Sequence, residues 1–234
     1  MTGGARRLGR ALATALAAEG VNIIVHYGRS ADEAEALRAL LAATGVRAWS
    51  IGADLADPEQ AATLVERADG LAGPIDILIN NASVFPADTL AELTLEGLLA
   101  TVRVNTWAPF VLSRALARQT DRGDVLQILD SKLAAIDPRH SSYLLSKHLL
   151  AVLTRMLAIE LAPRIRVNGI APGPILPPHG GTERDLERVA AEVPLRRPGR
   201  PENIAEAAVF LLRCDYVTGD VVYVDGGAHL AGHG

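Results

Sequence analysis

The residues of this chain best suited to acid–base chemistry are Tyr143 and Lys147, which stand four positions apart. On a helix, that spacing places both side chains on one face. A phenol with its ordinary pKa of about 10 is a poor proton donor at neutral pH, but a nearby lysine ammonium would lower that pKa. The alternative is a chance pair on a solvated helix face. The chain has only two lysines, Lys132 and Lys147, and this favours the functional interpretation.

Asp130 and Ser131 precede this pair, and the choice between them bears on the substrate. Both follow a strand expected at 125–129, and neighbouring side chains on a strand point to opposite faces. Only one of the two can therefore face Tyr143. A hydroxyl beside the phenol would suit reduction of a carbonyl group. A carboxyl could instead accept a hydrogen bond, or donate one if burial keeps it protonated.

Alternating strand and helix patterns surround these residues. Apolar runs predict strands at 21–27, 46–52, 75–79, 125–129, 165–170 and 221–224. Helical patterns end near Gly20, begin near Pro58, and cover 31–43, 95–105, 106–118 with an interruption at Pro109, 141–162, 183–192 and 201–213. This order predicts an α/β fold in a single domain, residues 1–234.

A glycine-rich turn at 2–9 opens the first helix. Such a turn presents backbone N–H groups and the positive end of the helix dipole to an anion, commonly a pyrophosphate. It should follow a strand, yet only Met1 precedes Thr2. We therefore expect the first strand to be missing from the chain as given, either because it was lost from the record or because the fold is built without it.

Polar residues follow the next strands. Arg29 and Ser30 come after 21–27, where an arginine accommodates the 2′-phosphate of NADP and a carboxylate would repel it. Asp57 is better placed than Asp54 to cap the helix that begins near Pro58, which leaves Asp54 free for another role. Its carboxylate could accept a hydrogen bond from a purine amino group. Phe85 is open to two interpretations, a loop residue tucked into the core or an exposed stacking platform.

Two further features stand out. Asn105 lies inside a predicted helix, where its side chain competes for backbone groups, and such a local conflict can mark a functional site. The Pro- and Gly-rich segment from 172 to 181 is too apolar for a disordered linker. It predicts a lid over a cleft, at about 174–200.

The composition excludes several classes of protein. The chain has 234 residues, 49% of them hydrophobic, a formal net charge of −4 and scattered arginines, so no nucleic-acid partner is expected. Cys214 is the single cysteine, which fits a reducing compartment. Because the sequence has no signal peptide, membrane-length apolar run or lipidation motif, we expect a cytoplasmic protein without a membrane partner. No metal is predicted.

These motifs together resemble the short-chain dehydrogenase/reductase family. The match covers the whole chain and rests on Thr2-Gly3-x-x-x-Arg7-x-Gly9, Asn80-Asn81-Ala82, Asn105, Tyr143-x-x-x-Lys147, Pro172-Gly173 and Asp225-Gly226-Gly227. The resemblance implies a Rossmann-type doubly wound parallel sheet with helices on both faces, and NADPH/NADP+ as cofactor. Tyr143 would be the proton donor and Lys147 would hold the nicotinamide ribose. Asn105 would organise a water that links Lys147 to solvent.

Four features resemble the pteridine reductase branch of that family. They are Arg7 in place of a second glycine, His26-Tyr27-Gly28-Arg29-Ser30, Asn81-Ala82-Ser83-Val84-Phe85, and Asp130 in place of the usual serine. The resemblance implies that the cofactor is bound by Gly3, Arg6, Arg7, Leu8, Tyr27, Arg29, Ser30, Asp54, Leu55, Asn81, Ala82, Ser83, Tyr143, Lys147, Pro172 and Gly173. It implies that the substrate is bound by Arg7, Ser83, Phe85, Asp130 and Tyr143.

The function expected from this branch is reduction of a C=N bond in a pterin, with the ring of Phe85 stacking on the substrate. Ile175 departs from it, because the branch often has a serine there. One alternative is a carbonyl reductase of the same family, acting on a 3-oxoacyl thioester or a small ketone. Another is a catalytically silent NADP-binding regulatory protein. The family's usual tetramers, paired through the helices at 106–118 and 141–162, lead us to expect a homotetramer.

Overall fold

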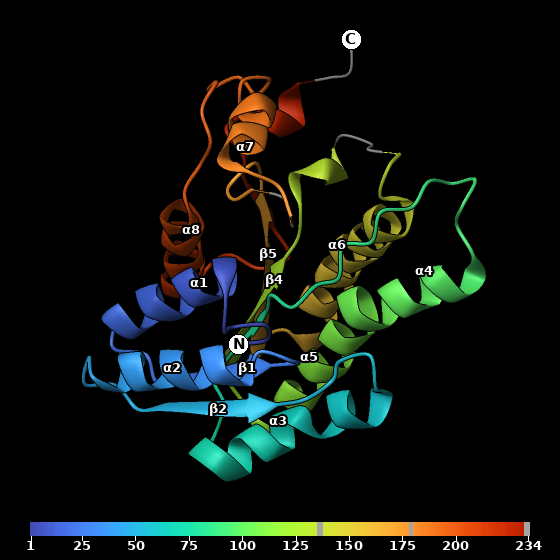
Figure 1. The fold of residues 1–234 in the computed structure, drawn as a ribbon. Coiled ribbons are helices and arrows are strands. Elements are labelled where there is room, and N and C mark those ends of the chain that lie inside the picture. The colour runs from blue at the N-terminus through green and yellow to red at the C-terminus, as the bar shows by residue number, and fades with distance from the viewer. Residues whose placement is uncertain (135–137, 178–179, 232–234) are drawn as a thin grey trace.

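The computed structural model describes residues 1–134, 138–177 and 180–231, which form an α/β fold (Figure 1). The strands are β1 (Ile23–Tyr27), β2 (Ala48–Gly52), β3 (Ile77–Asn80), β4 (Gly123–Ile128), β5 (Ile165–Pro172) and β6 (Val221–Val224). The α-helices are α1 (Arg7–Ala18), α2 (Ala31–Ala42), α3 (Pro58–Ala72), α4 (Leu95–Val102), α5 (Ala108–Gln119), α6 (Ser141–Leu161), α7 (Glu183–Ala190) and α8 (Pro201–Arg213).

All strand pairs are parallel, but the strands form two separate sheets. β1 pairs with β2, and the second sheet has the order β3-β4-β5-β6. Ile23 lies opposite Ala48 in the first sheet, and Leu78 lies opposite Val125 in the second. The two sheets are separated between β1 and β3, and residues Met1 and Thr2 lie between these strands, with hydrogen bonds from Met1 N to Ile24 O and from Thr2 N to Ile79 O.

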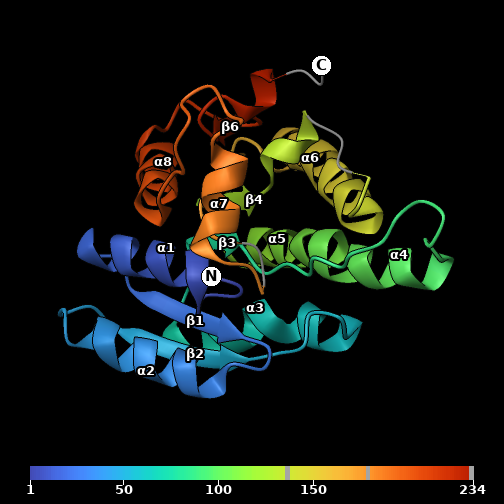
Figure 2. The ribbon, with the colours of Figure 1, turned by 45° about the horizontal axis from the view of Figure 1, so that its top comes forward.

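Helices cover both faces of the strands (Figure 2). One core cluster joins α1, α2 and α8 to the strands, with Leu12, Leu37 and Ile204 fully buried. The other joins α3, α5 and α6 to the opposite face, with Leu112 and Leu157 buried. Both faces are apolar because parallel strands are buried on both sides. The prediction of a doubly wound parallel sheet is therefore confirmed.

The start of α3 follows from local chemistry. The Asp57 side chain accepts from the backbone N–H groups of Glu59 and Gln60, and Pro58 occupies the first helical turn, where a missing N–H costs nothing. Asp57 is thus the helix cap, as predicted. Asp54, left free by this cap, uses its own carboxylate to accept from Ala56 N at 2.9 Å.

The helical interruption predicted at Pro109 was placed wrongly. Pro109 lies in the first turn of α5, where proline is tolerated. The irregularity is a π-helical segment, Arg103–Trp107, between α4 and α5, and it contains the buried Asn105. A π-bulge inserts a residue into the helical turn and is often found at functional sites. The local conflict that the sequence shows at Asn105 is accommodated in this way.

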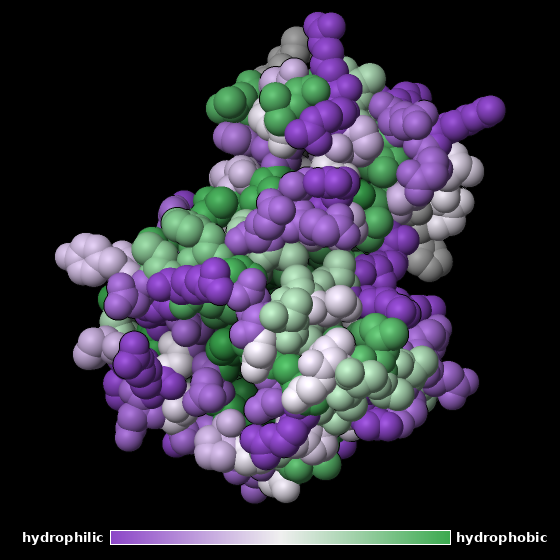
Figure 3. Space-filling model, turned by 90° about the vertical axis from the view of Figure 1, so that its left-hand side faces the viewer, coloured by the Kyte–Doolittle hydropathy of each residue, from purple (hydrophilic) through white to green (hydrophobic). Residues whose placement is uncertain are grey.

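On the side of the molecule that carries α1, α2 and α8, the surface is a mixture of polar and apolar residues (Figure 3). On α6, exposed apolar side chains follow one another at helical spacing: Leu145, Leu149, Val152, Met156 and Ile159. Within the described ranges, no helix has the length and apolar character needed to cross a membrane.

Candidate active site

Tyr143 and Asp130 form the centre of the site. Asp130 follows the end of β4, and Tyr143 lies in the first turn of α6. The phenol of Tyr143 donates to Asp130 Oδ2 at 2.6 Å, while Asp130 Oδ1 accepts from Lys132 N at 2.8 Å. Ser131 is buried and begins a short 3₁₀ helix, Ser131–Leu133. The carboxyl of Asp130, and not the hydroxyl of Ser131, therefore pairs with the phenol.

Lys147 lies one turn further along α6, below Tyr143. Its Nζ donates to the Ile128 carbonyl oxygen at 2.7 Å and lies 5.6 Å from the centroid of the Tyr143 ring. Burial lowers the pKa of Lys147 to about 8. Burial, followed by the charge of Asp130 and the hydrogen bond to it, raises the pKa of Tyr143. The expectation that Lys147 lowers this pKa was wrong here, because burial and Asp130 dominate.

Asn105 ties the segment after β3 to α6. Its Oδ1 accepts from Val84 N at 2.8 Å and from Ser83 Oγ at 3.1 Å. Its Nδ2 donates to Val84 O and to Ser146 Oγ, both at 3.0 Å. Both the oxygen and the nitrogen of the Asn105 amide therefore have hydrogen-bond partners, in the segment after β3 and in α6. Its position in the π-helical segment lets one side chain hold the loop before Phe85 and the helix that carries Tyr143.

Phe85 is an exposed platform at the mouth of the site. Its side chain is 41% exposed, so it is not tucked into the core. The ring stacks on His140 with centroids 3.9 Å apart and meets the Tyr143 ring edge-on at 4.5 Å. His140 Nδ1 lies 2.7 Å from Pro86 O and therefore carries the proton, which fixes the imidazole behind Phe85. Lys132 Nζ lies 5.5 Å from the centroid of the same ring.

The glycine-rich turn is held by side chains from β3 and the loop after it. Thr2 Oγ1 accepts from the backbone N–H groups of Asn81 and Ala82, and Asn81 Nδ2 donates to the carbonyls of Thr2 and Gly3. Gly3 has a φ of 59°, and a Cβ on Gly9 would come within 2.1 Å of Gly3 O. Both positions therefore require glycine, as the motif predicts.

His26, in β1, joins this turn to the end of β2. Gly3 N donates to His26 Nδ1 at 3.2 Å, and His26 Nε2 lies 3.0 Å from Ala53 O. Since a carbonyl only accepts, the proton sits on Nε2, and the ring is neutral. Burial is the main cause that lowers the pKa of His26 to about 4.

The other predicted cofactor residues lie around the carboxyl ends of the first two strands. Tyr27, Arg29 and Ser30 lie at and just after the end of β1, and Asp54 and Leu55 follow β2. Arg29 and Asp54 are exposed, whereas Leu55 is buried. Arg6 is an exposed residue whose Nη1 lies 3.4 Å from Glu33 Oε1.

Arg7 connects the turn to the predicted lid. Its backbone is left-handed, with a φ of 51°, and its Nη2 donates to Pro177 O at 2.5 Å. Residues 178 and 179 of the predicted lid lie outside the described residues. Beyond them, α7 lies above the carboxyl ends of the strands (Figure 1). Ile175 is buried in the core, so the position where the pteridine reductase branch often has a serine carries a packing residue here.

One cavity brings much of the predicted site together. It has a volume of about 1030 Å³. Nine of the predicted residues line it: Arg7, Leu8, Ser83, Phe85, Asp130, Tyr143, Lys147, Pro172 and Gly173. Gly3, Arg6, Tyr27, Arg29, Ser30, Asp54, Leu55, Asn81, Ala82 and Asn105 are not among its lining residues.

The sequence interpretation gave no individual role to His26 or His140. His26 carries a signal, since a polar residue inside an apolar strand needs a partner when buried. His140 carries none, because its stacking on Phe85 depends on contact between distant segments. Among the described residues, no three His, Cys, Asp or Glu side chains gather closely enough to hold a metal ion.

The turn and its surroundings fit a dinucleotide phosphate. The first turn of α1 has no side-chain cap, so its backbone N–H groups are available to an anion, and Arg7 and Leu8 from this turn line the cavity. The close approach of Gly3 and Gly9 leaves the backbone bare of side chains there. Exposed Arg29, after β1, can pair with a further phosphate.

The comparisons with known proteins agree with this geometry. A family model described as Enoyl-(Acyl carrier protein) reductase matches residues 3–229. A short-chain type dehydrogenase/reductase of Picea abies is 32% identical, over 97% of this chain and 90% of its own length. The chain belongs to the short-chain dehydrogenase/reductase family. It is therefore an oxidoreductase by family. Versicolorin reductase 1 of Aspergillus parasiticus is also 32% identical, over 97% of this chain and 94% of its own length.

Solved structures give the same fold. FolM alternative dihydrofolate reductase 1 of Brucella suis, in complex with NADP, is 36% identical and has a TM-score of 0.95, covering 100% of this chain and 95% of that chain. A blue fluorescent protein from a metagenomic library, in complex with NADPH, is 38% identical with a TM-score of 0.89, covering 97% and 95% of the two chains. The prediction of NADPH/NADP+ as cofactor agrees with both.

We predict that the two side-chain hydrogen bonds of His26, to Gly3 N and to Ala53 O, can be removed one at a time by substitution. In His26→Asn the amide oxygen can still accept from Gly3 N, and in His26→Gln the amide nitrogen can still donate to Ala53 O. Each variant loses about 1–3 kcal/mol of stability, because one buried group is left without a partner. The dissociation constant for NADPH, measured by fluorescence titration, should rise more for His26→Gln, which frees the turn. Equal constants for the two variants would contradict this role.

We also predict a pH dependence of stability that comes from Lys147. Its folded pKa of about 8 lies below the unfolded value, so the unfolded chain binds more protons between these pKa values, and stability rises with pH there. From pH 7.5 to pH 9.5, the free energy of unfolding of the wild type should rise by about 2 kcal/mol relative to Lys147→Met. Urea titrations of both proteins test this, and parallel pH profiles would refute it.

Proposed function

We propose that this chain is an NADPH-dependent reductase that acts on a C=N bond of a pterin, of the dihydropteridine or dihydrofolate type. The observation that carries the proposal is the hydrogen bond between Tyr143 and Asp130 at 2.6 Å, beside the exposed ring of Phe85. A pterin is a flat ring rich in nitrogen, so it needs a stacking surface and several donor and acceptor groups. The same mouth offers both.

The residues have distinct tasks in this reaction. Reduction of a C=N bond adds a hydride to carbon and a proton to nitrogen, and NADPH, when bound, supplies the hydride. The phenol of Tyr143 carries its proton at neutral pH, and because burial and Asp130 raise its pKa, it is a weaker acid than a free phenol. Its role as donor therefore depends on its position beside the substrate and not on an unusual acidity. Asp130 orients the phenol by accepting its hydrogen bond, and the phenol then donates its proton to a ring nitrogen of the substrate.

Binding falls to the residues around the cavity. The turn at Gly3, with Arg6, Arg7 and Leu8, holds the pyrophosphate, and Arg29 with Ser30 holds the 2′-phosphate. The nicotinamide end of the cofactor is bound by Lys147, Asn81, Ala82, Pro172 and Gly173. The adenine end is bound by Tyr27, Asp54 and Leu55. Phe85 stacks on the substrate, with Arg7 and Ser83 at its edge. Asn105 holds the loop that carries Phe85, and residues 174–200 form the lid over this single domain.

We predict that Asp130→Ser abolishes pterin reduction. Loss of a positioned carboxyl should lower kcat by about 100-fold or more, while the dissociation constant for NADPH stays within about 2-fold, because Asp130 lies at the substrate end. Steady-state rates with dihydrobiopterin and NADPH titrations measure the two quantities.

Ser131→Ala is the matched control, since Ser131 is adjacent and buried but does not pair with Tyr143. Its turnover should remain at the wild-type level. If Asp130→Ser retained turnover while Ser131→Ala lost it, the reaction would be that of a carbonyl reductase. If NADPH bound and no substrate of either class reacted, the chain would be a silent NADP-binding protein.

We further propose that the protein works as a homotetramer in the cytoplasm. The single cysteine, Cys214, is free and suits a reducing compartment. The exposed apolar residues of α6, among them Ile159 at 81% exposure, suit burial against a second copy of the chain.

We predict that Ile159→Glu shifts the sedimentation coefficient of the purified protein to that of a smaller assembly, because a carboxylate would be buried in the interface. Leu40→Glu is the matched control, since Leu40 is an exposed apolar residue on α2, away from this face. Sedimentation velocity of the three proteins gives the answer. An unchanged coefficient for Ile159→Glu would exclude α6 from the interface.

A further inference from the structure

The loop after β3 meets the first turn of α6 at Asp88. Asp88 and His140 pair as an isolated parallel bridge. Asp88 N donates to Arg139 O at 3.1 Å, and Ser141 N donates to Asp88 O at 2.9 Å. The Asp88 carboxylate also accepts from Ser142 N at 3.0 Å. Asp88 therefore binds the start of the helix through both its backbone and its side chain.

The start of α6 needs this outside partner. The first N–H groups of a helix have no acceptor within it, so a side chain usually caps them. Within the part of the chain that the structure describes, the N-cap residue His140 makes no side-chain cap, and the first turn of α6 holds no acidic residue. The Asp88 carboxylate meets both needs, because it accepts from Ser142 N and places a negative charge at the positive end of the helix dipole.

The His140 ring contacts Phe85 instead of capping the helix. The two rings stack with their centroids 3.9 Å apart, and His140 Nδ1 lies 2.7 Å from Pro86 O. Phe85 lies in the same short loop as Asp88, so this loop reaches the helix through a backbone bridge and through a ring stack. The Phe85 ring also meets the Tyr143 ring edge-on at 4.5 Å.

The loop is fixed to α6 on both sides of Phe85. Before Phe85, Asn105 binds the backbone of the loop and donates to Ser146 Oγ in α6. After Phe85, Asp88 bonds to the first turn of the same helix. Tyr143 lies between these two points of attachment on α6. The position of the Phe85 ring relative to the phenol is therefore set from both directions along the chain.

We propose that Asp88 and His140 are positioning residues of the reductase reaction. Together they clamp the loop that carries Phe85 onto the first turn of α6, so that a flat substrate stacked on the Phe85 ring meets the phenol of Tyr143. This inference rests on the function proposed above, because only a substrate that stacks on Phe85 would need the clamp for binding. The bonds of Asp88 fix both the stacking surface and the donor helix, whereas the His140 ring supports the stacking surface alone.

The test compares Asp88→Ala, Asp88→Asn and His140→Ala in the full chain. In Asp88→Ala the acceptor of Ser142 N is lost, and kcat with dihydrobiopterin should fall about 10-fold or more, because a small misplacement of reacting groups is costly. KM should rise about 3-fold or more as the stacking surface loosens. Asp88→Asn keeps an acceptor of the same shape and should restore both constants. His140→Ala should raise KM by a similar factor with a much smaller change in kcat.

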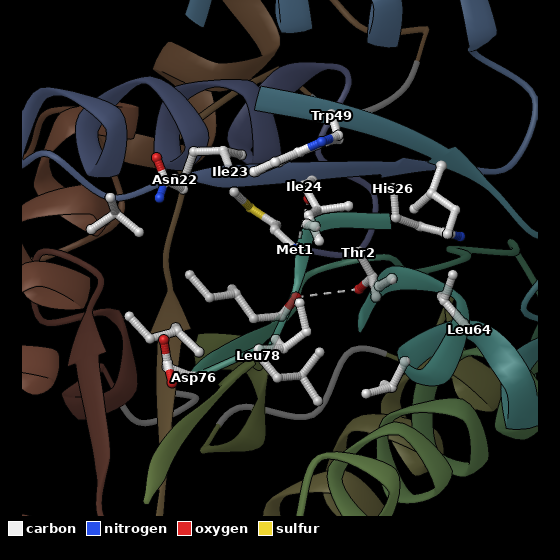
Figure 4. A pocket seen from close by; sticks show the side chains of 18 of the residues that line it. Met1, Thr2, Asn22, Ile23, Ile24, His26, Trp49, Leu64, Asp76 and Leu78 are labelled. Atoms are coloured by element: carbon white, nitrogen blue, oxygen red, sulfur yellow. Dashed lines mark hydrogen bonds between the residues drawn. The ribbon is translucent and has the colours of Figure 1, made fainter. Parts of the chain in front are cut away.

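Asp57→Ala is the matched control. Asp57 caps α3 with the same chemistry, by accepting from Glu59 N and Gln60 N. Leu64 on this helix lines the separate cavity between β1 and β3 (Figure 4). Every residue of α3 is described, and none lines the cavity of the candidate site. Asp57→Ala and Asp88→Ala should each lower the midpoint of thermal unfolding by about 2–4 °C. With NADPH saturating, only Asp88→Ala should change kcat and KM.

Several results would overturn the proposal. One is an unchanged kcat and KM in Asp88→Ala, and another is an equal loss of kcat in Asp88→Ala and Asp57→Ala, since lowered stability alone would then be the cause. If Asp88→Asn lost turnover as fully as Asp88→Ala, the charge and not the clamp would matter. If Asp88→Ala did not fold, His140→Ala would decide, and an unchanged KM in that variant would contradict the clamp.

The proposed function and this inference fail separately. If the wild type reduced an acetoacetyl thioester and no pterin, the proposed function would be wrong, and amide exchange would then decide on the clamp. Asp88→Ala should speed exchange at Ser141 and Val84, whose acceptors the substitution leaves in place, more than Asp57→Ala does. Unchanged exchange at these two amides would overturn the clamp, whatever the substrate.

Discussion

The structure depends on the hydrogen bonds made by residues 2–4, in the turn ahead of the first helix. Thr2 bonds to Ile79 on β3, and Gly3 and Gly4 bond to His26 on β1, so this turn bridges strands that no direct ladder joins. Asn81 closes the turn from the other side through two carbonyls. A single turn therefore both spans the divided sheet and presents the end of α1 that we propose binds phosphate. Any change that loosens it affects the fold and cofactor binding together.

The acid–base centre is held in place by a second, independent network. Asn105 joins the loop before Phe85 to α6, while Lys147 fixes the same helix to the end of β4 through Ile128 O. Tyr143 lies between these two anchors, with Asp130 at 2.6 Å. The proposed proton donor and the proposed stacking surface are thus joined through one hydrogen-bond network, which is the arrangement that proton transfer to a stacked ring would require.

Much of this could be predicted from the sequence, because it follows from local rules. The alternation of apolar runs and helical patterns places every strand, and the helix cap at Asp57 and the need for glycine at Gly3 follow from short-range chemistry. What could not be predicted depends on tertiary contact. The pKa of Tyr143 reflects how deeply the fold buries it, the pairing of His140 with Phe85 joins distant segments, and the π-helical turn at Asn105 appears only once α4 and α5 are packed.

The most direct test of the account is to follow NADPH oxidation by the purified protein with dihydrobiopterin and dihydrofolate, beside an acetoacetyl thioester at the same concentration. The account predicts turnover of a pterin and little or none of the thioester, because a carboxyl and an aromatic face line the mouth where a ketone would need a hydroxyl. Turnover of the thioester alone would contradict the roles given to Asp130 and Phe85, and would leave the fold and the cofactor site standing.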